Sequence, residues 1–243
     1  MEDETKFNGY MQAYVSIDCV ILGFDGKQLN ILLVERKNFP AGEEKLKLPG
    51  SLIYQEEDSD TAAARVLYEL TGIRKMALRQ FKSFTSLQRT SSPADRLWLE
   101  VEYHHHIERL ITIAYLSLCK INRKLNIVSK YKSVNWIPVN ALPTMPFDHN
   151  QIVREALEEV QSWGEYEPSI LFELLPSKFT AADLRHLYET IYHKTCDVRN
   201  FHKKMAGMEY VVPLDEKEQG VAHRAARLYK FDRISYNKRK VTL

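Results

Sequence analysis

The segment at residues 59–70, SDTAAARVLYEL, restricts the fold more than any other part of the sequence. Its apolar residues follow the i, i+3, i+4, i+7 spacing that gathers side chains on one face of a helix. These residues are Ala63, Val66, Leu67 and Leu70. Ser59 or Asp60 can cap the start of this helix, and Gly72 is a typical residue just past a helix end. The segment is therefore an amphipathic helix that must bury one face against other elements.

Apolar runs with strand-like composition flank this helix on both sides. Residues 13–24 and 29–35 are rich in Ile and Val and are separated by a turn containing Asp25 and Gly26, so we expect a hairpin of two largely buried strands. Further strands are expected at residues 46–50, 76–87, 110–119 and 134–138. Strands before and after one amphipathic helix predict an α/β or α+β domain.

The second half of the chain has a different pattern. Residues 148–163 form a second amphipathic helix, with Asp148 as its N-cap, and residues 164–168 look like a linker. Short helices are expected at 169–174, 180–193 and 197–208, followed by two apolar runs at 210–214 and 225–231. Three helices followed by a hairpin is the plan of a winged helix. We therefore expect two domains, residues 1–164 and residues 165–243.

Several residues around the first helix stand at the spacing of a known motif. Gly50, Glu56, Arg65, Glu69 and Gly72 resemble the Nudix box, Gly-x5-Glu-x7-Arg-Glu-apolar-x-Glu-Glu-x-Gly-apolar. That resemblance implies a loop, helix and loop that hold a divalent metal over a diphosphate through carboxylates one helical turn apart. It also implies an N-terminal Nudix-like α/β/α sandwich, and hence an α+β fold class for the whole chain.

The match departs from the box at the metal-binding positions. Counted from Arg65, the first and third helical glutamates are Val66 and Leu70, and one extra residue separates Glu56 from Arg65. Because valine and leucine cannot ligate a cation, we expect no metal site, no cofactor and no hydrolysis. The alternative is an active Nudix hydrolase of ADP-ribose or a related nucleoside diphosphate, which Gly50, Glu56, Arg65 and Glu69 would favour.

The C-terminal half resembles the DNA-binding end of the Nudix-related transcriptional regulators. The matching segments are Leu-Pro-Ser-Lys-Phe-Thr at 175–180, Arg-Asn-Phe at 199–201 and Ala-Arg-Leu-Tyr-Lys-Phe at 226–231. With the Nudix half, the resemblance covers nearly the whole chain. It implies a transcriptional regulator with a C-terminal winged helix-turn-helix domain that binds double-stranded operator DNA.

The residues of the expected helix at 197–208 favour the same function. Asp197 can cap it, and its apolar residues Val198, Phe201, Met205 and Met208 should face inward. The polar residues that remain outside, with three basic residues from the expected wing, are the DNA-binding candidates: Arg199, Asn200, Lys203, Lys204, His223, Arg224 and Arg227. From residue 194 onward the chain holds twelve Lys and Arg against six Asp and Glu, which gives this segment a net charge of +6. Because the whole chain has a net charge of +2, the remainder has a net charge of −4. A solvated basic face without a nucleic-acid partner would give the same pattern.

A cleft without metal carboxylates suits a neutral polar ligand. The sequence is most similar to the arabinose-responsive regulators of Bacteroides-type bacteria, which implies a small-molecule effector such as the sugar L-arabinose. Sugar hydroxyls need converging charged and polar groups, and the candidates for effector binding are Asp18, Lys45, Lys47, Glu56 and Glu69. A surface or structural role is equally open for each of them.

Residues 91–108 look like an insertion, which could make dimer contacts or cover the effector pocket. Its His104, His105 and His106 would point to opposite faces of a strand, so they cannot share one ion.

Cys19, Cys119 and Cys196 are far apart, which favours free thiols. With an acidic, polar start and no long apolar segment, we expect no membrane contact, a cytoplasmic location and a homodimer. A protein-binding adaptor built on a winged helix is a further alternative.

Overall fold

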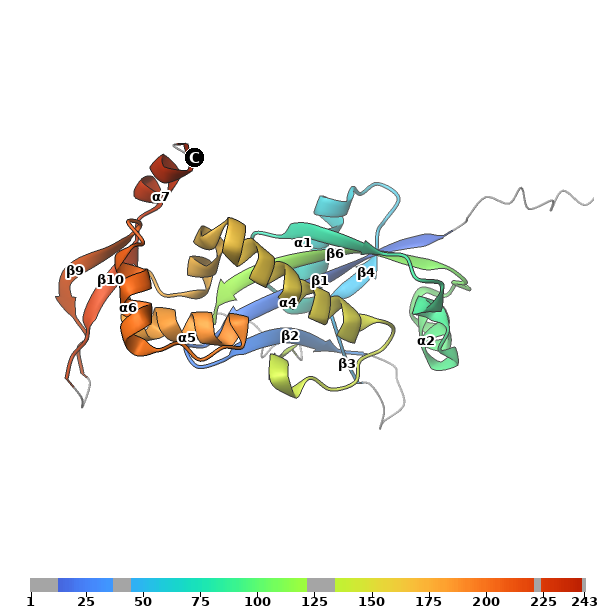
Figure 1. Ribbon diagram of the computed structural model, residues 1–243. Helices are drawn as coiled ribbons and strands as arrows, with labels where there is room; N and C mark the ends of the chain where they lie inside the picture. The colour runs from blue at the N-terminus through green and yellow to red at the C-terminus, as the bar shows by residue number, and fades with distance from the viewer. Residues whose placement is uncertain (1–12, 37–44, 122–133, 221–223, 242–243) are drawn as a thin grey trace, which may run out of the picture.

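Strand β1 (Tyr14–Phe24) is the centre of a seven-stranded sheet within residues 13–36, 45–121, 134–220 and 224–241, which the computed structural model describes (Figure 1). It pairs in parallel with β6 (Leu110–Lys120) along its whole length. Its other edge is shared, because β4 (Gly50–Leu52) pairs with its first part and β2 (Leu29–Glu35) with its last part. The sheet is completed by β3 (Leu46–Lys47) and β7 (Val134–Pro138) on β2, and by β5 (Arg79–Phe84) on β6.

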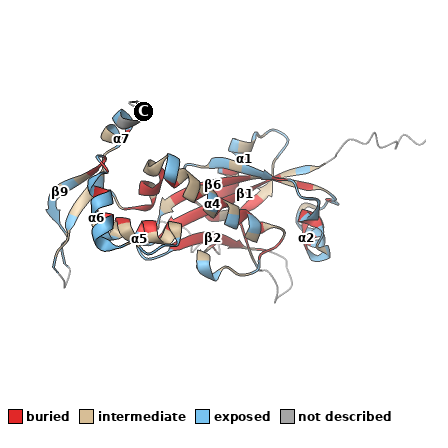
Figure 2. Ribbon diagram, in the orientation of Figure 1, coloured by how far each residue is buried: buried red, intermediate tan, exposed pale blue. Residues whose placement is uncertain are grey.

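The alternation of side chains along β1 divides the core into two layers. Ile17, Cys19 and Ile21 pack against helix α1 (Ser59–Thr71) on one face of the sheet. On the other face the apolar side chains of β1, β2 and β6 pack with helix α4 (His149–Tyr166). Both faces of the sheet are therefore buried, which explains why its central strands are continuous apolar runs (Figure 2).

The ends of α1 are set by local hydrogen bonds. The side chain of Asp58, and not that of Ser59 or Asp60 as predicted, caps the helix by accepting a hydrogen bond from the Thr61 N–H at 2.7 Å. Gly72 ends the helix in a left-handed conformation, with φ of 76°, as the sequence predicts. A 3-10 turn, η1 (Leu87–Thr90), leads into the predicted insertion, which contains helix α2 (Pro93–Tyr103).

Helix α4 connects the two halves of the molecule. It follows a 3-10 turn, η2 (Val139–Ala141), and continues to Tyr166, through the first part of the segment expected to be a linker. The short helix predicted at 169–174 is part of a 3-10 helix, η3 (Pro168–Leu174), which packs against β6. In Figure 1, α4 lies across the sheet between α2 at one end and the wing strands at the other.

The C-terminal part is a small three-stranded sheet with helices beside it. Its elements are β8 (Phe179–Thr180), α5 (Ala181–Tyr192), α6 (Val198–Ala206), β9 (Val211–Lys217), β10 (Arg227–Phe231) and α7 (Arg233–Val241). The strand order is β8-β10-β9. Phe172 of η3 stacks on Phe231 of β10 with ring centroids 4.5 Å apart, which ties this sheet to the connecting segment. Every helix of the described ranges is too short or too polar to cross a membrane.

A capping box at the start of α5 gives a test of this part of the fold. Thr180 accepts a hydrogen bond from the Asp183 N–H at 3.1 Å, and the Asp183 carboxylate accepts one from the Thr180 N–H at 2.8 Å. Replacing Thr180 with Ala should lower the free energy of unfolding by about 1 kcal/mol, and Thr180→Ser should retain most of it. Urea denaturation of the full chain measures both. Thr190→Ala, at an exposed hydroxyl near the other end of the same helix, is the control and should have little effect.

Candidate functional site

A small cleft opens between β1, the β3–β4 turn, α2 and the start of α4. Its lining combines charged groups at the base with aromatic rings on the side of α2. The lining residues are Ser16, Asp18, Lys47, Gly50, Ser51, Leu52, Arg89, Trp98, Leu99, Tyr103, Leu110, Phe147 and His149. Such a mixture of a few convergent polar groups and aromatic walls is typical of a small-molecule site.

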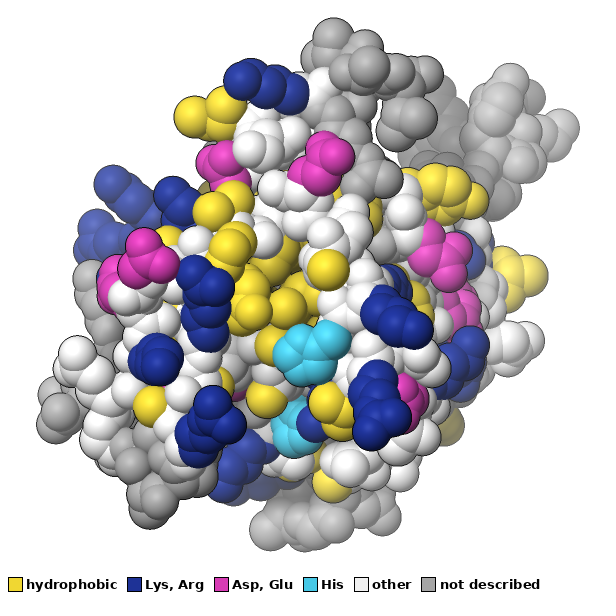
Figure 3. All heavy atoms as spheres, turned by 60° about the vertical axis from the view of Figure 1, so that its left-hand side comes forward, with side chains coloured by type: hydrophobic (Ala, Val, Ile, Leu, Met, Phe, Trp, Pro, Cys, Tyr) yellow, Lys and Arg dark blue, Asp and Glu magenta, His cyan; other side chains and the backbone are white. Residues whose placement is uncertain are grey.

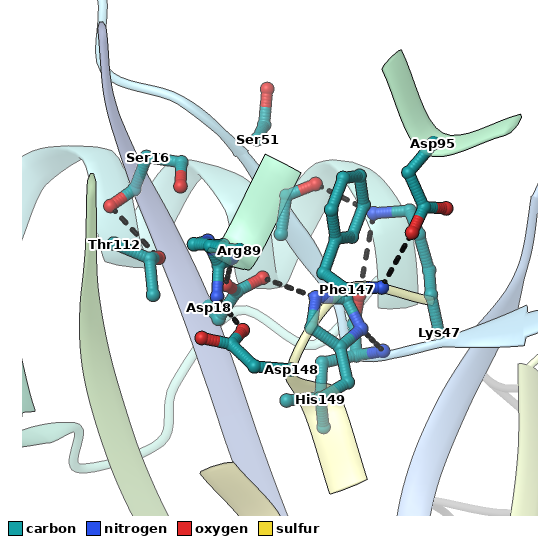
Figure 4. Close-up of polar contacts among 12 residues, drawn as sticks. Ser16, Asp18, Lys47, Ser51, Arg89, Asp95, Thr112, Phe147, Asp148 and His149 are labelled. Atoms are coloured by element: carbon teal, nitrogen blue, oxygen red, sulfur yellow. Dashed lines mark hydrogen bonds and ion pairs between the residues drawn. The ribbon is translucent and has the colours of Figure 1, made fainter. Parts of the chain in front are cut away.

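Asp18 is the centre of a buried network of charges at the base of the cleft (Figure 4). Arg89 donates a hydrogen bond from Nη2 to Asp18 Oδ2 at 2.6 Å, and its Nη1 donates to Asp148. The Nε2 atom of His149 lies 3.4 Å from Asp18 Oδ1. The network thus joins β1, the 3-10 turn η1 and the first residues of α4.

The protonation states in this network follow from burial and from the neighbouring charges. Burial raises the pKa of Asp18, but His149, Arg89 and Lys47 outweigh it and hold the pKa well below its usual value, so Asp18 is ionised. Burial lowers the pKa of His149, against the attraction of Asp18. The Leu48 N–H donates to His149 Nδ1 at 3.3 Å, so a neutral ring carries its proton on Nε2, where it faces Asp18.

Asp148 does not cap α4 as the sequence predicts. It stands at the N-cap position, but its side chain makes no capping hydrogen bond and binds Arg89 instead. Burial raises the pKa of Asp148, while Arg89 and His149 lower it. A bond between a guanidinium and a carboxylate is stronger than a bond to a backbone N–H, which explains why this aspartate turns away from its helix.

Lys47 and Gly50 build the opposite wall. The buried ammonium of Lys47 donates to the carbonyl oxygen of Gly50 at 2.8 Å and to that of Leu48 at 3.3 Å. Burial lowers the pKa of Lys47 to about 8, although Asp18 raises it. Gly50 pairs with Asp18 in the β1–β4 ladder, and a Cβ atom there would lie 2.0 Å from Asp18 Oδ1. Only glycine leaves space for the carboxylate.

Helix α2 closes the cleft with aromatic side chains, so the structure is consistent with the predicted pocket-covering role of the insertion. Asp95 of α2 binds Arg36 at 2.9 Å and accepts the Phe147 N–H at 2.9 Å. The second bond helps to hold Phe147 in a left-handed conformation, with φ of 56°. Trp98 packs edge-on against Phe147, with ring centroids 6.2 Å apart.

The cleft brings together two of the five predicted effector-binding residues. Asp18 and Lys47 line it. Lys45 lies at the surface and pairs with Glu35 at 3.2 Å, and Glu56 and Glu69 are exposed residues outside the lining. The sequence analysis missed the other charged and ring-bearing residues of the lining, which are Arg89, Trp98, Tyr103, Phe147 and His149.

The region that resembles the Nudix box is organised around Arg65. The side chain of Arg65 donates two hydrogen bonds to Glu57, at 2.5 and 2.8 Å, and one to Glu69 at 3.2 Å. Glu57, and not Glu56, therefore pairs with Arg65 at the seven-residue spacing of the box, and the extra residue falls between Gly50 and Glu57. Val66 is fully buried against the sheet, and Leu70 packs against the same core. In the described part of the chain no cluster of three or more His, Cys, Asp or Glu side chains could hold a metal ion.

Helix α6 presents a polar, basic face to the surface. Phe201, Met205 and Met208 are buried as predicted, whereas Val198 is 52% exposed because it begins the helix on the outer side. The exposed face includes Arg199, Asn200, His202, Lys203 and Lys204. Figure 3 shows Lys and Arg side chains spread over this side of the molecule, with fewer Asp and Glu between them.

Two other predicted DNA-binding residues, Arg224 and Arg227, lie on or near the wing formed by β9 and β10. Arg224 is exposed, and Arg227 donates to the Leu214 carbonyl oxygen at 2.9 Å and pairs with Asp215 at 3.1 Å. His223 lies outside the described residues. The Lys204 ammonium lies 4.4 Å from the centre of the Tyr188 ring, so part of its interaction is with α5.

Comparisons with known proteins divide the chain in the same way. The model of the NUDIX domain matches residues 13–160, and that of the NrtR DNA-binding winged helix domain matches residues 171–231. The chain is 25% identical over 232 residues to the ADPR responsive transcriptional repressor NtrR of Acinetobacter baylyi, covering 94% of this chain and 86% of the relative.

Solved structures show the same arrangement. Shewanella oneidensis NrtR complexed with a 27mer DNA is 19% identical with a TM-score of 0.67, covering 92% of this chain and 95% of that one. A MutT/nudix family protein from Enterococcus faecalis is 22% identical with a TM-score of 0.61, covering 92% of this chain and 89% of that one. The predicted fold class, an α/β/α sandwich followed by a winged helix, is confirmed.

The close approach of Gly50 to Asp18 gives a test of the cleft. Gly50→Ala should lower the free energy of unfolding by about 2 kcal/mol, because the new methyl group would overlap Asp18 Oδ1 and the Ile17 carbonyl oxygen at 2.8 Å. Gly207→Ala is the matched control, since its Cβ would have ordinary contacts of 3.4 Å or more. Equal stability of the two variants in urea denaturation would contradict the geometry at Gly50.

Proposed function

The chain belongs to the Nudix domain family, and from this premise we propose that it is a DNA-binding transcriptional regulator whose Nudix domain binds a small effector. The observation that carries the proposal is α6, which buries an apolar side and exposes a basic, amide-bearing side. A recognition helix needs both, an anchored back and a polar front that enters the major groove.

The positions of the polar residues on α6 support DNA binding. Arg199 and Asn200 lie in its first turn, and the N-terminal residues of a recognition helix are the ones that reach base edges. Lys203 lies one turn further along the helix, suited to a phosphate contact. Among the similar proteins, one is named a transcriptional repressor, and another was solved with a 27mer DNA. A homodimer, with a pseudo-palindromic operator, stays a prediction.

We propose further that the Nudix domain does not hydrolyse a diphosphate. Two of the three glutamate positions of the box helix hold the apolar Val66 and Leu70, and Arg65 is engaged by the acidic residues beside it. A carboxylate set of this size is poor for Mg²⁺, which prefers several oxygen ligands in octahedral geometry. The role that the fold retains is ligand recognition.

For the effector, we propose a small neutral sugar, such as the L-arabinose implied by the resemblance. Both cationic side chains of the lining are already engaged, Arg89 by two aspartates and Lys47 by two carbonyl oxygens, which disfavours a diphosphate. Asp18 is bonded to Arg89 and His149, but each carboxylate oxygen has a second lone pair that can accept a hydrogen bond from a sugar hydroxyl. Trp98 and Phe147 offer apolar ring surfaces. The comparisons give arabinose no support, and the Acinetobacter baylyi relative is named for ADPR. ADP-ribose is therefore the competing ligand.

The α6 surface predicts distinct effects for two substitutions. With duplex DNA from upstream of its own gene, Arg199→Ala should weaken binding by about tenfold or more, and Lys203→Ala should reduce the salt dependence by about one phosphate contact. Gel shifts over a range of salt concentrations measure both. The control is Lys82→Ala, which removes a surface lysine of β5 that pairs with Glu155 of α4. Unchanged binding in both α6 variants would contradict the proposal and favour the adaptor alternative.

The cleft predicts which ligand stabilises the protein. L-arabinose should raise the Tm, because it binds the folded state and not the unfolded state. Asp18→Asn should weaken this binding by about tenfold, because it replaces the charged acceptor. Glu69→Gln, outside the cleft, should bind it as the unsubstituted protein does. If ADP-ribose raises the Tm and L-arabinose does not, the effector is ADP-ribose and not the sugar. Breakdown of ADP-ribose with Mg²⁺ or Mn²⁺ that Glu69→Gln abolishes would establish the hydrolase alternative.

A further inference from the structure

Two side chains connect Asp18 to the start of helix α4: His149, which is the first residue of the helix, and Arg89, which reaches it through Asp148. Arg89 is buried, with 3% of its surface exposed, and it bridges Asp18 at the base of the cleft to Asp148 at the start of α4. Its two partners are ionisable carboxylates from elements that lie far apart in sequence. Because one guanidinium is shared by two carboxylates, a change in its hydrogen bond to one of them alters its hydrogen bond to the other.

Two details indicate that this bridge is not fully satisfied as it stands. Among the described residues, the buried Nε atom of Arg89 has no hydrogen-bond partner. Asp148 gives up the capping bond that its position would allow. A buried donor without a partner and a helix start without its side-chain cap both cost free energy, so a rearrangement that satisfied either group would recover part of that cost.

Helix α4 carries the start of this bridge to the DNA-binding half. Its 18 residues extend about 27 Å. Near its other end Gln161 donates to the Ile191 carbonyl oxygen of α5 at 2.7 Å, and the Tyr192 hydroxyl donates to the Gln161 carbonyl oxygen at 3.4 Å. Gly164 allows this close contact, because a Cβ atom there would lie 2.4 Å from the Tyr192 hydroxyl oxygen.

Helix α5 in turn holds the basic helix. Tyr188 of α5 packs edge-on against Phe201 of α6, with ring centroids 5.7 Å apart. The buried residues from β1 through α4 and α5 to α6 belong to one hydrophobic cluster. Packed interiors shift between discrete arrangements and do not deform continuously, so a change at the first residues of α4 can reach α6.

We propose that Arg89 couples the cleft to the DNA-binding surface: a ligand that engages Asp18 weakens the Asp18–Arg89 bond, changes the hold of Arg89 on Asp148, and so shifts α4 against α5 and α6. This coupling rests on the proposed function, whose cleft and DNA surface it joins. Arg89 acts as a positioning residue, since its effect reaches DNA through Asp148 and α4.

The first test needs neither ligand nor DNA. Amide hydrogen exchange is measured on the full chain for Asp18→Asn, Asp148→Asn and the double variant. Asp18→Asn should change exchange in α5 and α6, and in the Asp148→Asn background its effect there should be much smaller, because only the contact with His149 remains to carry it. Glu155→Gln, a carboxylate-to-amide change on the same helix whose partner is Lys82, is the matched control and should leave the effect of Asp18→Asn intact. Changes confined to β1 and the cleft, or equal changes in both backgrounds, would overturn the coupling.

The second test measures the coupling to DNA directly. The Kd for upstream duplex DNA is measured with and without saturating L-arabinose, and with ADP-ribose in parallel. The ratio of the Kd for DNA with the sugar to the Kd without it should differ from one by about fivefold or more in the unsubstituted protein. In Asp148→Asn this ratio should be close to one, although the variant should still bind the sugar and the DNA separately. A ratio that persists in Asp148→Asn would refute the role of Arg89. If the sugar or DNA fails to bind the unsubstituted protein, the proposed function fails, and the exchange experiment alone decides the coupling.

Discussion

The burial of one ionised aspartate, Asp18, determines how the segments around the cleft come together. Asp18 lies on a central strand, where an isolated carboxylate would be very costly to remove from water. Its charge is supported by Arg89 and by the imidazole of His149, and the space for it is left by Gly50. Each of these partners comes from a different segment, so the pairing of one side chain fixes where a 3-10 turn, a strand and the start of a long helix meet. The cleft is the space that these segments enclose with α2.

Much of the fold could be predicted because its elements are specified locally. The helix at residues 59–70, the buried central strands and the capping box at Thr180 follow from short-range periodicity and side-chain chemistry. The errors arose where two neighbouring residues could serve equally well by sequence. Asp58 caps α1 in place of Ser59 or Asp60, and Glu57 binds Arg65 in place of Glu56, because only the three-dimensional path of the loop decides between adjacent candidates.

The site was less accessible to prediction than the fold. Asp18 and Lys47 could be proposed because charged residues in an apolar strand or beside a Pro-Gly turn are conspicuous. Arg89 and His149 could not, because they meet Asp18 only through contacts across 71 and 131 residues of sequence. Asp148 shows the same limit in reverse, since a residue with a strong local preference to cap α4 is drawn away by a distant guanidinium.

The uninterrupted passage of α4 from the sandwich to the winged helix has a consequence for how the protein unfolds. The hydrophobic cluster that begins on the sheet includes Leu171 and Leu174 of η3, Leu187 of α5 and Phe201 of α6. Neither half can lose its structure without exposing apolar surface of the other, so melting of the two should be cooperative, with one shared transition in place of two. Such a junction makes the pair of domains a single thermodynamic unit, in contrast to two modules on a flexible tether.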